Sequence, residues 1–429
     1  MTLVTPEEVE EHLSRLVRHL VATVETDPPE TIDLADAAGR ILAGDLPADR
    51  DQPPFDRAAM DGIALPAGSL KAGVRTFTHG GVLAAGADPE PFADPSSRDA
   101  CIEIMTGAAV PRGFDTVVRY EDLRDETVDG SRSMTVVDGE YRGGEHIHPR
   151  GADYRTGARL LSAGTRIGVG HVAVLASAGA ARVAVRRGLR IAVLGTGDEL
   201  VPVAATPHPQ QIRASNGATI AAELAGWGFP AADVGICGDD REELRRTIAE
   251  RLDRADVVLL TGAVSRGLYD AVPDLLRELG VTVHLHGVRQ RPGKPLLVGS
   301  RGATVVLGLP GNPVSSLTSV RRYLVPALTA AWGSDRDARG RAAAGIPARL
   351  AHDVDFRPEL AWLPAVKLED HADGEGDAGG DASLRVSVVD GNGSGDFSQL
   401  AGSAGILHVP EDRRRSPAGT VLRFFPWAI

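Results

Sequence analysis

Short apolar segments alternate with amphipathic helical patterns between residues 190 and 328 of the 429-residue chain. The clearest apolar segments span residues 190–194, 256–260 and 304–307, and their length and composition are those of buried strands. Helical patterns separate these segments along the chain. Because buried strands that alternate with helices form parallel sheets covered on both faces, the pattern predicts a doubly wound α/β domain.

Polar loops follow the apolar segments of this region. Their sequences are GTGDEL at 195–200, GDD at 238–240, TGAVSRGLYD at 261–270, RPGKP at 291–295 and LPGNP at 309–313. In a doubly wound sheet, such loops lie beyond the carboxyl ends of the strands and form the ligand crevice. Several carboxylates, a lysine, an arginine and many backbone amides there favour an anionic, phosphate-bearing ligand bridged by a divalent metal.

The rest of the chain differs in pattern from this region. Residues 5–45 contain two helical patterns, and residues 47–142 contain short alternating β segments among many glycines and prolines. A further helical pattern and a strand-like segment follow between residues 143 and 187. Residues 335–345 are typical of a linker, and residues 346–429 alternate like the strands of a compact β-barrel.

Composition and charge exclude several classes of protein. Hydrophobic residues make up 43% of the chain, which is ample for several buried cores, and the net charge of −12 argues against a general nucleic-acid or membrane-surface binder. The two cysteines, Cys101 and Cys237, lack CxxC spacing, so neither a disulfide framework nor a structural zinc site is indicated, and a cytosolic protein is the simplest interpretation. The acidic, amphipathic start of the chain is typical of a capped helix rather than a signal peptide, and no apolar run reaches the length of a membrane span.

Acidic residues in three of the loops are candidate metal ligands. Asp239 and Asp240 precede a helical pattern, so a capping box explains the pair without catalysis, and the sequence alone favours that interpretation. Asp270 is also able to cap the helical pattern that follows it. Asp198 and Glu199 stand in a turn bracketed by glycine and leucine, which favours a metal ligand over an ordinary charged loop.

Two helix starts and a basic loop are the candidate anion sites. Ser215 is expected to cap a helix whose free amides, near Asn216, face the crevice. Asn312 is expected to cap a second helix with Pro313 as its first residue, which gives a second set of free amides. Lys294 stands between two prolines, so ordering it on a phosphate costs less entropy than ordering a lysine on a mobile loop. None of these loops is a P-loop, because the chain contains no GxxxxGK(S/T) sequence.

Two further motifs, AMDG at 59–62 and MTGA at 105–108, precede the loops. The order and spacing of all these motifs resemble the molybdopterin molybdenumtransferase family, which shares its domain plan with the E domain of gephyrin. The resemblance extends from residue 5 to about residue 406. It implies an enzyme that inserts molybdate into adenylylated molybdopterin and releases AMP and the finished molybdenum cofactor. It also implies Mg²⁺ as the metal cofactor.

The domain plan of the family implies a multidomain α/β and β protein. Residues 1–46 and 143–187 would form an elongated discontinuous domain, interrupted by residues 47–142 as a small β-rich domain. Residues 188–334 would form the α/β molybdopterin-binding domain, which resembles the molybdopterin adenylyltransferase fold, and residues 335–429 would form a C-terminal β-barrel domain. The family further implies a cytoplasmic homodimer with a site shared between subunits. Its implied partners are molybdopterin adenylyltransferase upstream and recipient molybdoenzymes, with no nucleic acid or membrane.

The resemblance also gives roles to individual residues. The implied catalytic residues are Asp61, Thr106, Glu199, Asp239 and Asp270, and the last three are also the implied metal ligands. The implied substrate-binding residues are Asp153, Ser215, Asn216, Ser265, Arg291, Lys294, Pro310, Asn312 and Pro313. Without the resemblance, Asp61 and Thr106 are ordinary turn residues, and Asp153 is equally well explained as a charge that solvates a loop.

Several positions depart from the family pattern. Glu103 stands where the family usually carries arginine, Ile63 replaces a usual tyrosine, and Leu268 replaces an acid two residues before Asp270. The other departures are Arg57, Ala58, His148, Ala152 and Ala263. They motivate a second hypothesis, a divergent non-catalytic paralogue that binds molybdopterin or a partner protein. A third hypothesis is a molybdopterin adenylyltransferase, which would bind ATP directly and which resembles the α/β domain alone.

Overall fold

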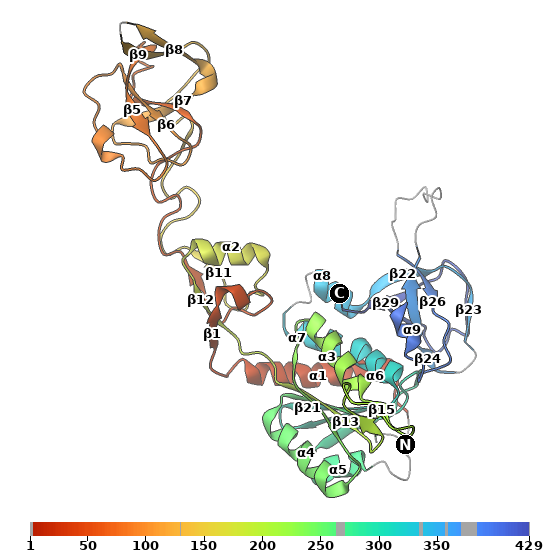
Figure 1. Cartoon of the computed structure of the whole chain (residues 1–429). Coiled ribbons are helices and arrows are strands. Elements are labelled where there is room, and N and C mark those ends of the chain that lie inside the picture. Colours follow the sequence, from red (N-terminus) through yellow and green to blue (C-terminus); the bar gives the residue numbers. More distant parts are fainter. Residues whose placement is uncertain are drawn as a thin grey trace. The chain divides into compact units, whose positions relative to one another are not determined.

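The chain divides into two compact units in the computed structural model, which describes residues 3–128, 130–262, 271–333, 338–356, 359–369 and 384–428 (Figure 1). The α/β–barrel unit comprises Met1–Thr31, Gly39–Ile41 and Ala184–Ile429, and the β-rich unit comprises Ile32–Ala38 and Leu42–Val183. Each unit has hydrophobic cores of its own. The four finer domain boundaries expected from the sequence stay predictions.

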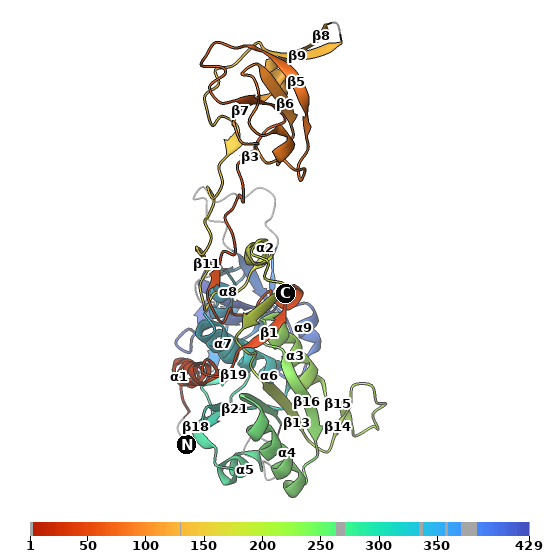
Figure 2. The ribbon, with the colours of Figure 1, turned by 90° about the vertical axis from the view of Figure 1, so that its left-hand side faces the viewer.

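A six-stranded sheet forms the centre of the α/β–barrel unit (Figure 2). In sheet order, its strands are β16 (Ala231–Cys237), β13 (Ile191–Thr196), β17 (Val257–Thr261), β21 (Thr304–Leu309), β20 (Leu297–Arg301) and β18 (Thr282–His286). The first four are parallel, and β20 is antiparallel to both of its neighbours. Because β16 and β17 lie on opposite sides of β13, the strand order reverses there, and the predicted doubly wound domain is confirmed.

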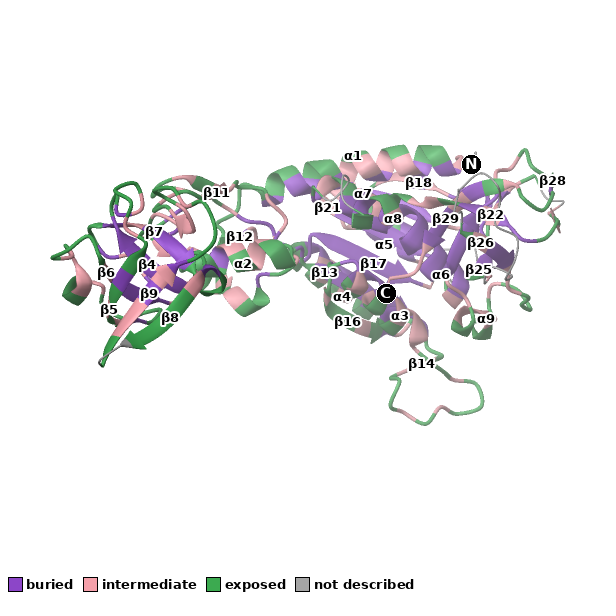
Figure 3. Ribbon diagram, turned by 90° about the horizontal axis from the view of Figure 1, so that it is seen from above, coloured by how far each residue is buried: buried purple, intermediate pink, exposed green. Residues whose placement is uncertain are grey.

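Helices cover both faces of this sheet. They are α1 (Pro6–Val24), α3 (Ser215–Gly226), α4 (Arg241–Arg254), α5 (Val272–Glu278), α6 (Pro313–Ser319), the π-helix η4 (Val320–Leu324) and α7 (Val325–Ala331). Side chains alternate along a strand, so Ile191 and Val193 join a core with α1, α3 and α7, whereas Ala192 and Leu194 join a second core with α4 and α5. Burial on both faces explains why these parallel strands are continuous apolar runs in the sequence (Figure 3).

Helix α1 begins with a capping box, as the sequence predicts. The Thr5 hydroxyl accepts from the amide of Glu8 at 3.3 Å, and the Glu8 carboxylate accepts from the amide of Thr5 at 2.7 Å. Val9, Leu13 and Val17 share one face of the helix and are buried in the same core as β13. The first helix therefore packs within the α/β–barrel unit.

The C-terminal part of the same unit is a closed β-barrel, as predicted. In barrel order, its strands are β22 (Ile346–Leu350), β26 (Arg385–Val388), β25 (Ala365–Leu368), β27 (Gly405–His408) and β29 (Val421–Pro426). The expectation of a linker at 335–345 is wrong for its described part, which forms helix α8 (Ala338–Ala344). Alanine favours helix, and Ala343 is buried in the same core as β13, which holds the segment in place.

Short strand pairs and one helical turn complete the α/β–barrel unit. The pairs are β14 (Leu200–Val201) with β15 (Ile212–Arg213), β19 (Gln290–Arg291) with β24 (Ala361–Trp362), and β23 (Val354–Asp355) with β28 (Arg415–Ser416). The turn is α9 (Ser398–Ala401). Within the described residues, no helix is long and apolar enough to cross a membrane.

The β-rich unit contains a six-stranded sheet of mixed direction, in agreement with the β-rich character expected from the sequence. In sheet order, its strands are β7 (Phe114–Arg119), β4 (Gly62–Pro66), β6 (Ala100–Ile104), β5 (Thr76–Leu83), β9 (Ser131–Val136) and β8 (Leu123–Val128). Its smaller elements are β2 (Leu46–Pro47), β3 (Arg57–Ala58), β10 (Ile147–His148), β11 (Arg159–Leu161), α2 (Val169–Ser177) and the 3-10 helices η1 (Leu34–Asp36), η2 (Glu90–Phe92) and η3 (Tyr120–Asp122). The second helical pattern expected before residue 45 is thus only the short η1. The boundaries between the units fall within the paired strands β1 (Glu30–Asp33) and β12 (Arg182–Val185), and also before Gly39 and after Ile41.

Candidate functional site

The loops after β13, β17 and β21 are packed into one surface at the carboxyl edge of the parallel sheet. Gly262, directly after β17, shows how closely they approach. Its amide donates to the carbonyl of Leu309 at 3.3 Å, and its φ of +93° favours glycine. A Cβ at this position would lie 2.5 Å from the carbonyl oxygen of Thr196. Glycine is therefore required for the contact among the three loops.

Asp198 and Asp239 cross-link the loops after β13 and β16. The Asp198 carboxylate accepts from the amide of Asp239 at 2.9 Å, and the Asp239 carboxylate accepts from the amide of Asp198 at 3.4 Å. Asp240 caps α4 by accepting from the amide of Glu243 at 2.9 Å. The capping role expected for the acidic pair thus belongs to Asp240 alone, and Asp239 remains exposed beside Asp198.

Glu199 adds a third exposed carboxylate to these two loops. A Cβ at Gly197 would lie 2.3 Å from Glu199 Oε2, so the glutamate side chain covers the backbone of that glycine. Carboxylate oxygens are the ligand type that Mg²⁺ prefers, so Asp198, Glu199 and Asp239 suit such an ion in their chemistry. Within the described residues, no three His, Cys, Asp or Glu side chains are grouped closely enough to hold a metal.

The loop after β17 lies largely outside the described residues. It contains two of the expected site residues, Asp270 and Ser265, and the family departures Ala263 and Leu268. The helix that follows, α5, has Ala271 at its N-cap position, without a side-chain capping hydrogen bond. The expected metal set of Glu199, Asp239 and Asp270 therefore stays a prediction.

Helix α3 presents its first turn at the same edge, but its cap differs from the prediction. Ala214 occupies the N-cap position, and Ser215 is the first helical residue, so the expectation that Ser215 caps the helix is wrong. The chain enters α3 directly from β15, which places the serine one residue too late to cap. Asn216 Nδ2 donates to the carbonyl of Gly311 at 2.7 Å, which ties α3 to the loop after β21. The buried Asn216 Oδ1 has no hydrogen-bond partner among the described residues.

The loop after β21 leads through the buried Pro310 to the start of α6. Asn312 is the N-cap residue and Pro313 the first helical residue, as predicted. The Asn312 side chain does not cap, however, because its Nδ2 donates to Ser394 Oγ at 2.9 Å. Ser394 belongs to the glycine-rich segment GNGSG of the barrel at 391–395. Sequence reasoning missed this contribution of the barrel to the site, because the glycine-rich run does not indicate which distant residue it contacts.

The basic loop is held by its backbone and leaves its charged side chains exposed. The amide of Val288 donates to the carbonyl of Lys294 at 2.9 Å, and the amide of Leu363 donates to the carbonyl of Arg291 at 2.8 Å. Gly293, between the two basic residues, has a φ of +91° and packs against Ser319. In the described part of the chain, neither basic side chain has a hydrogen-bond or ion-pair partner. A fixed backbone with unpaired cations suits a phosphate ligand.

Asp61 and Thr106 form a direct pair in the β-rich unit. Asp61 Oδ1 accepts from the amide of Thr106 at 2.6 Å and from its hydroxyl at 2.7 Å. The amide hydrogen bond, followed by the hydroxyl hydrogen bond, lowers the pKa of the exposed Asp61 carboxyl below its usual range. Gly62, the next residue, packs closely against β7, because a Cβ there would lie 1.9 Å from the carbonyl oxygen of Val118. Two motifs that are far apart in the sequence thus form one preorganised carboxylate.

Glu103, which departs from the family pattern, is the centre of a buried charge cluster. Its side chain is only 8% exposed. Glu103 Oε2 accepts from the Tyr120 hydroxyl at 2.6 Å, Oε1 accepts from Arg132, and His79 Nε2 lies 2.9 Å from Oε1. Arg132 also forms an ion pair with Asp125 at 2.7 Å. The negative charge at this position is therefore compensated within the β-rich unit.

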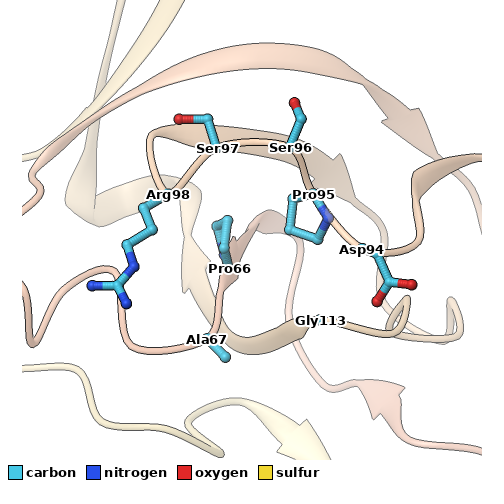
Figure 4. Close-up of a pocket in the computed structure, with 8 residues that line it drawn as sticks. All are labelled: Pro66, Ala67, Asp94, Pro95, Ser96, Ser97, Arg98 and Gly113. Atoms are coloured by element: carbon cyan, nitrogen blue, oxygen red, sulfur yellow. The ribbon is translucent and has the colours of Figure 1, made fainter.

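Asp153, another expected site residue, and the strand residue His284 are explained by local contacts. Asp153 pairs with His148 at 3.0 Å, and both side chains are at least one-third exposed. His284 Nε2 lies 2.8 Å from Ser300 Oγ, and burial lowers the pKa of its imidazole. A surface hollow of about 330 Å³ in the β-rich unit contains no expected site residue; Asp94 and Arg98 lie on opposite sides of it (Figure 4).

The architecture is that of α/β proteins that bind ligands at the carboxyl edge of a parallel sheet. Residues 7–179 match the family model of the MoeA N-terminal region (domain I and II), and residues 192–330 match that of the probable molybdopterin binding domain. The chain is 32% identical over 399 residues to the molybdopterin molybdenumtransferase of Synechocystis sp. (92% of this chain and 95% of that protein). The enzyme of the same name from Bacillus subtilis is 31% identical over 326 residues (75% of this chain and 74% of that protein). The crystal structure of the molybdopterin biosynthesis MoeA protein from Pyrococcus horikoshii aligns with a TM-score of 0.75 and 26% identity over 99% of both chains. The chain belongs to the molybdopterin molybdenumtransferase family.

Proposed function

We propose that this protein inserts molybdate into adenylylated molybdopterin and releases AMP. The observation that carries the proposal is the carboxyl edge of the parallel sheet, where exposed carboxylates, free helix amides and unpaired basic side chains come from consecutive loops. A substrate with a pyrophosphate needs all three kinds of group. The two alternatives are a divergent non-catalytic paralogue and a molybdopterin adenylyltransferase.

The basic and amide groups position the substrate in this proposal. The first-turn amides of α3 have no partners within the helix, so they would donate hydrogen bonds to a phosphate oxygen, and Ser215 and Asn216 lie beside them. Arg291 and Lys294 neutralise phosphate or molybdate charge. Both act from a loop whose backbone is already fixed, so little entropy is lost when the ligand binds.

The acidic groups act on the scissile end of the substrate. Glu199, Asp239 and Asp270 would hold Mg²⁺, which supplies compensation for the negative charge that develops on the AMP leaving group. Asp198 and the amide of Asp239 keep the two loops at a fixed separation, so the acidic side chains are oriented before the substrate arrives. The molybdenum would be held by the dithiolene sulfurs of the pterin, so no protein cysteine is needed.

A second copy of the chain completes the proposed site. Asp61 and Thr106 would act from the β-rich unit of the partner in a homodimer. Their hydrogen bonds keep Asp61 ionised, so it would face the substrate as a fixed negative group that orients a metal or a donor. We further propose a cytoplasmic enzyme that receives its substrate from a molybdopterin adenylyltransferase and delivers the cofactor to molybdoenzymes. Both cysteines are free and buried, which agrees with a reducing compartment.

A matched pair of variants tests the proposal. Asp239→Ala removes a carboxylate assigned to the reaction, whereas Asp240→Ala removes the neighbouring cap of α4. Purified proteins receive adenylylated molybdopterin, Mg²⁺ and molybdate, and AMP release is followed by chromatography. We expect Asp239→Ala to lose release while it remains folded, and Asp240→Ala to retain release with a stability loss of about 1 kcal/mol. Equal AMP release by Asp239→Ala and wild type would contradict the proposal.

Binding measurements separate the two alternatives. An adenylyltransferase must bind ATP directly, whereas the proposed enzyme needs none. Calorimetric titration with ATP therefore discriminates these two functions. A non-catalytic paralogue would bind adenylylated molybdopterin tightly and release no AMP under any molybdate concentration.

A further inference from the structure

An apolar hollow of about 480 Å³ opens beside the start of α3 in the α/β–barrel unit. Its walls come from α3, α6, the α9 turn of the barrel and the last described residues of the chain. The segments that form it are far apart in the sequence but belong to the same compact unit. The residues that matter for the argument are Ser215, Ala222, Glu223, Leu317, Phe397 and Trp427.

One wall of the hollow is apolar and aromatic. Phe397 is 60% exposed, so much of its ring is free to contact a ligand. Leu317 of α6 and Trp427 near the C-terminus line the same space. The Trp427 indole nitrogen donates to Ser403 Oγ at 2.8 Å, so its polar group is already satisfied. A flat apolar ring would therefore gain contact area here without breaking a hydrogen bond.

A buried carboxylate lies at the same hollow. Glu223 is only 6% exposed. Oε1 accepts from the Trp227 indole nitrogen at 2.8 Å, and Oε2 accepts from the amide of Ala428 at 3.0 Å. The two oxygens of a carboxylate together offer about four acceptor positions, so Glu223 can accept hydrogen bonds from further N–H donors. Arg321, 3.6 Å away, fixes the orientation of the carboxylate.

The hollow also reaches the phosphate end of the candidate site. Ser215 lines it and is the first residue of the 12-residue helix α3. Glu223 lies eight positions after Ser215 along the helix, which is roughly 12 Å at 1.5 Å per residue. A ligand with a phosphate at the helix start and a ring system extending along α3 would therefore reach Glu223.

We propose that this hollow binds the pterin ring of the substrate, with Phe397 against the ring face and Glu223 accepting from its N–H edge. The aminopyrimidinone edge of a pterin carries adjacent N–H donors, which a carboxylate pairs with well. The ring face stacks on an aromatic side chain as a nucleobase does. The phosphate of the same molecule then lies at the first turn of α3. This inference rests on the proposed function. It adds a binding site for the pterin ring, the part of the substrate that the protein would recognise.

The test obstructs the hollow without touching the groups assigned to the reaction. Ala222 is exposed and lines the hollow, and Ala225 is exposed on the same helix outside it. Ala222→Phe fills the hollow, and Ala225→Phe is its matched control. The full-length proteins are titrated with molybdopterin and, separately, with AMP, and quenching of Trp427 fluorescence reports occupancy of the hollow. A Trp427→Phe protein identifies the share of the signal that comes from this residue.

We expect Ala222→Phe to weaken molybdopterin binding at least tenfold and to leave AMP binding unchanged. Phe397→Ala should weaken molybdopterin binding by about tenfold, the usual effect of losing one stacking partner. If wild type and Ala222→Phe bind molybdopterin equally, the hollow is not the pterin site and the inference is overturned. If the two proteins bind molybdopterin equally but wild type releases AMP, the proposed function still holds. Molybdopterin binding that depends on Ala222 and Phe397, without AMP release, would support the inference and contradict the proposed function.

Discussion

The charge cluster around Glu103 makes a quantitative prediction for the stability of the β-rich unit. Replacing Glu103 with glutamine removes the ionic contact to Arg132 and leaves the shape of the side chain nearly unchanged. Breaking a buried ion pair costs about 3–5 kcal/mol, because one charge remains without compensation. Arg132 is 38% exposed and keeps Asp125 as a partner, so water and that carboxylate recover part of the cost. We therefore expect Glu103→Gln to lose about 2 kcal/mol.

The assay is calorimetric unfolding of the full chain, with urea unfolding as a second measure. For a unit of this size, about 2 kcal/mol corresponds to a fall in Tm on the order of 5 °C. Arg112→Gln serves as a control in the same unit, because Arg112 and Asp94 are 68% and 64% exposed and such surface pairs contribute at most about 1 kcal/mol.

A double-mutant cycle isolates the interaction between the two charges. Glu103→Gln combined with Arg132→Gln should be less destabilised than the sum of the single variants, with a coupling of about 1–2 kcal/mol. Glu103→Arg, which restores the charge usual in the family, should be worse than Glu103→Gln, because it places a cation beside Arg132 and His79. A coupling near zero, or a Glu103→Arg protein as stable as wild type, would refute this account of the cluster.

Three further predictions follow from single positions. His408 is buried as a neutral imidazole. Its burial and, to a smaller extent, two neighbouring arginines lower its pKa to about 3. The unfolded chain takes up this proton near pH 6.5, so the contribution of His408 to stability is complete above that pH. It is lost as the pH falls toward 3, at about 1.4 kcal/mol per pH unit, and a His408→Gln protein should lack this slope in pH-dependent urea unfolding. Gly62→Ala should destabilise the β-rich unit by at least about 3 kcal/mol, because the new Cβ meets backbone at 1.9 Å; Gly44→Ala, with nothing within 4 Å, should change calorimetric stability little. Thr106→Val removes one of the two hydrogen bonds to Asp61, so the pKa of that carboxyl should rise toward its usual value in a carbon-13 NMR titration, and an unchanged pKa would rule out the hydroxyl as a cause.

The parallel sheet could be predicted from sequence because burial on both faces leaves a simple pattern. Residues 191–194 and 257–260 are continuous apolar runs, and the strands found there are buried throughout. The β-barrel could also be predicted from the sequence, because residues 346–429 alternate between apolar and polar like the strands of a barrel. Helix α8 was missed because its sequence is rich in arginine and glycine as well as alanine, and its helical state depends on Ala343 packing against a distant part of the chain. Tertiary contacts of this kind leave no local signal.

Some features of the candidate site depend on residues that are neighbours in the sequence, and others depend on contacts between distant segments. Local capping rules placed Asp240 correctly as the cap of α4 and Asn312 at the N-cap position of α6, although the Asn312 side chain does not cap. The same rules failed at Ser215, where the entry from β15 shifts the cap to Ala214. The contact between Asn312 and Ser394 joins the α/β domain to the barrel, so no rule based on sequence neighbours could identify it. The roles of the expected site residues stay predictions.

Molybdate-dependent release of AMP tests the central claim most directly. Purified wild-type protein is incubated with adenylylated molybdopterin and Mg²⁺, with and without molybdate, and AMP and finished cofactor are quantified from the same samples. The proposed function predicts that AMP and cofactor form in equal amounts and only when molybdate is present. Tight binding of the adenylylated substrate without AMP release at any molybdate concentration would contradict it.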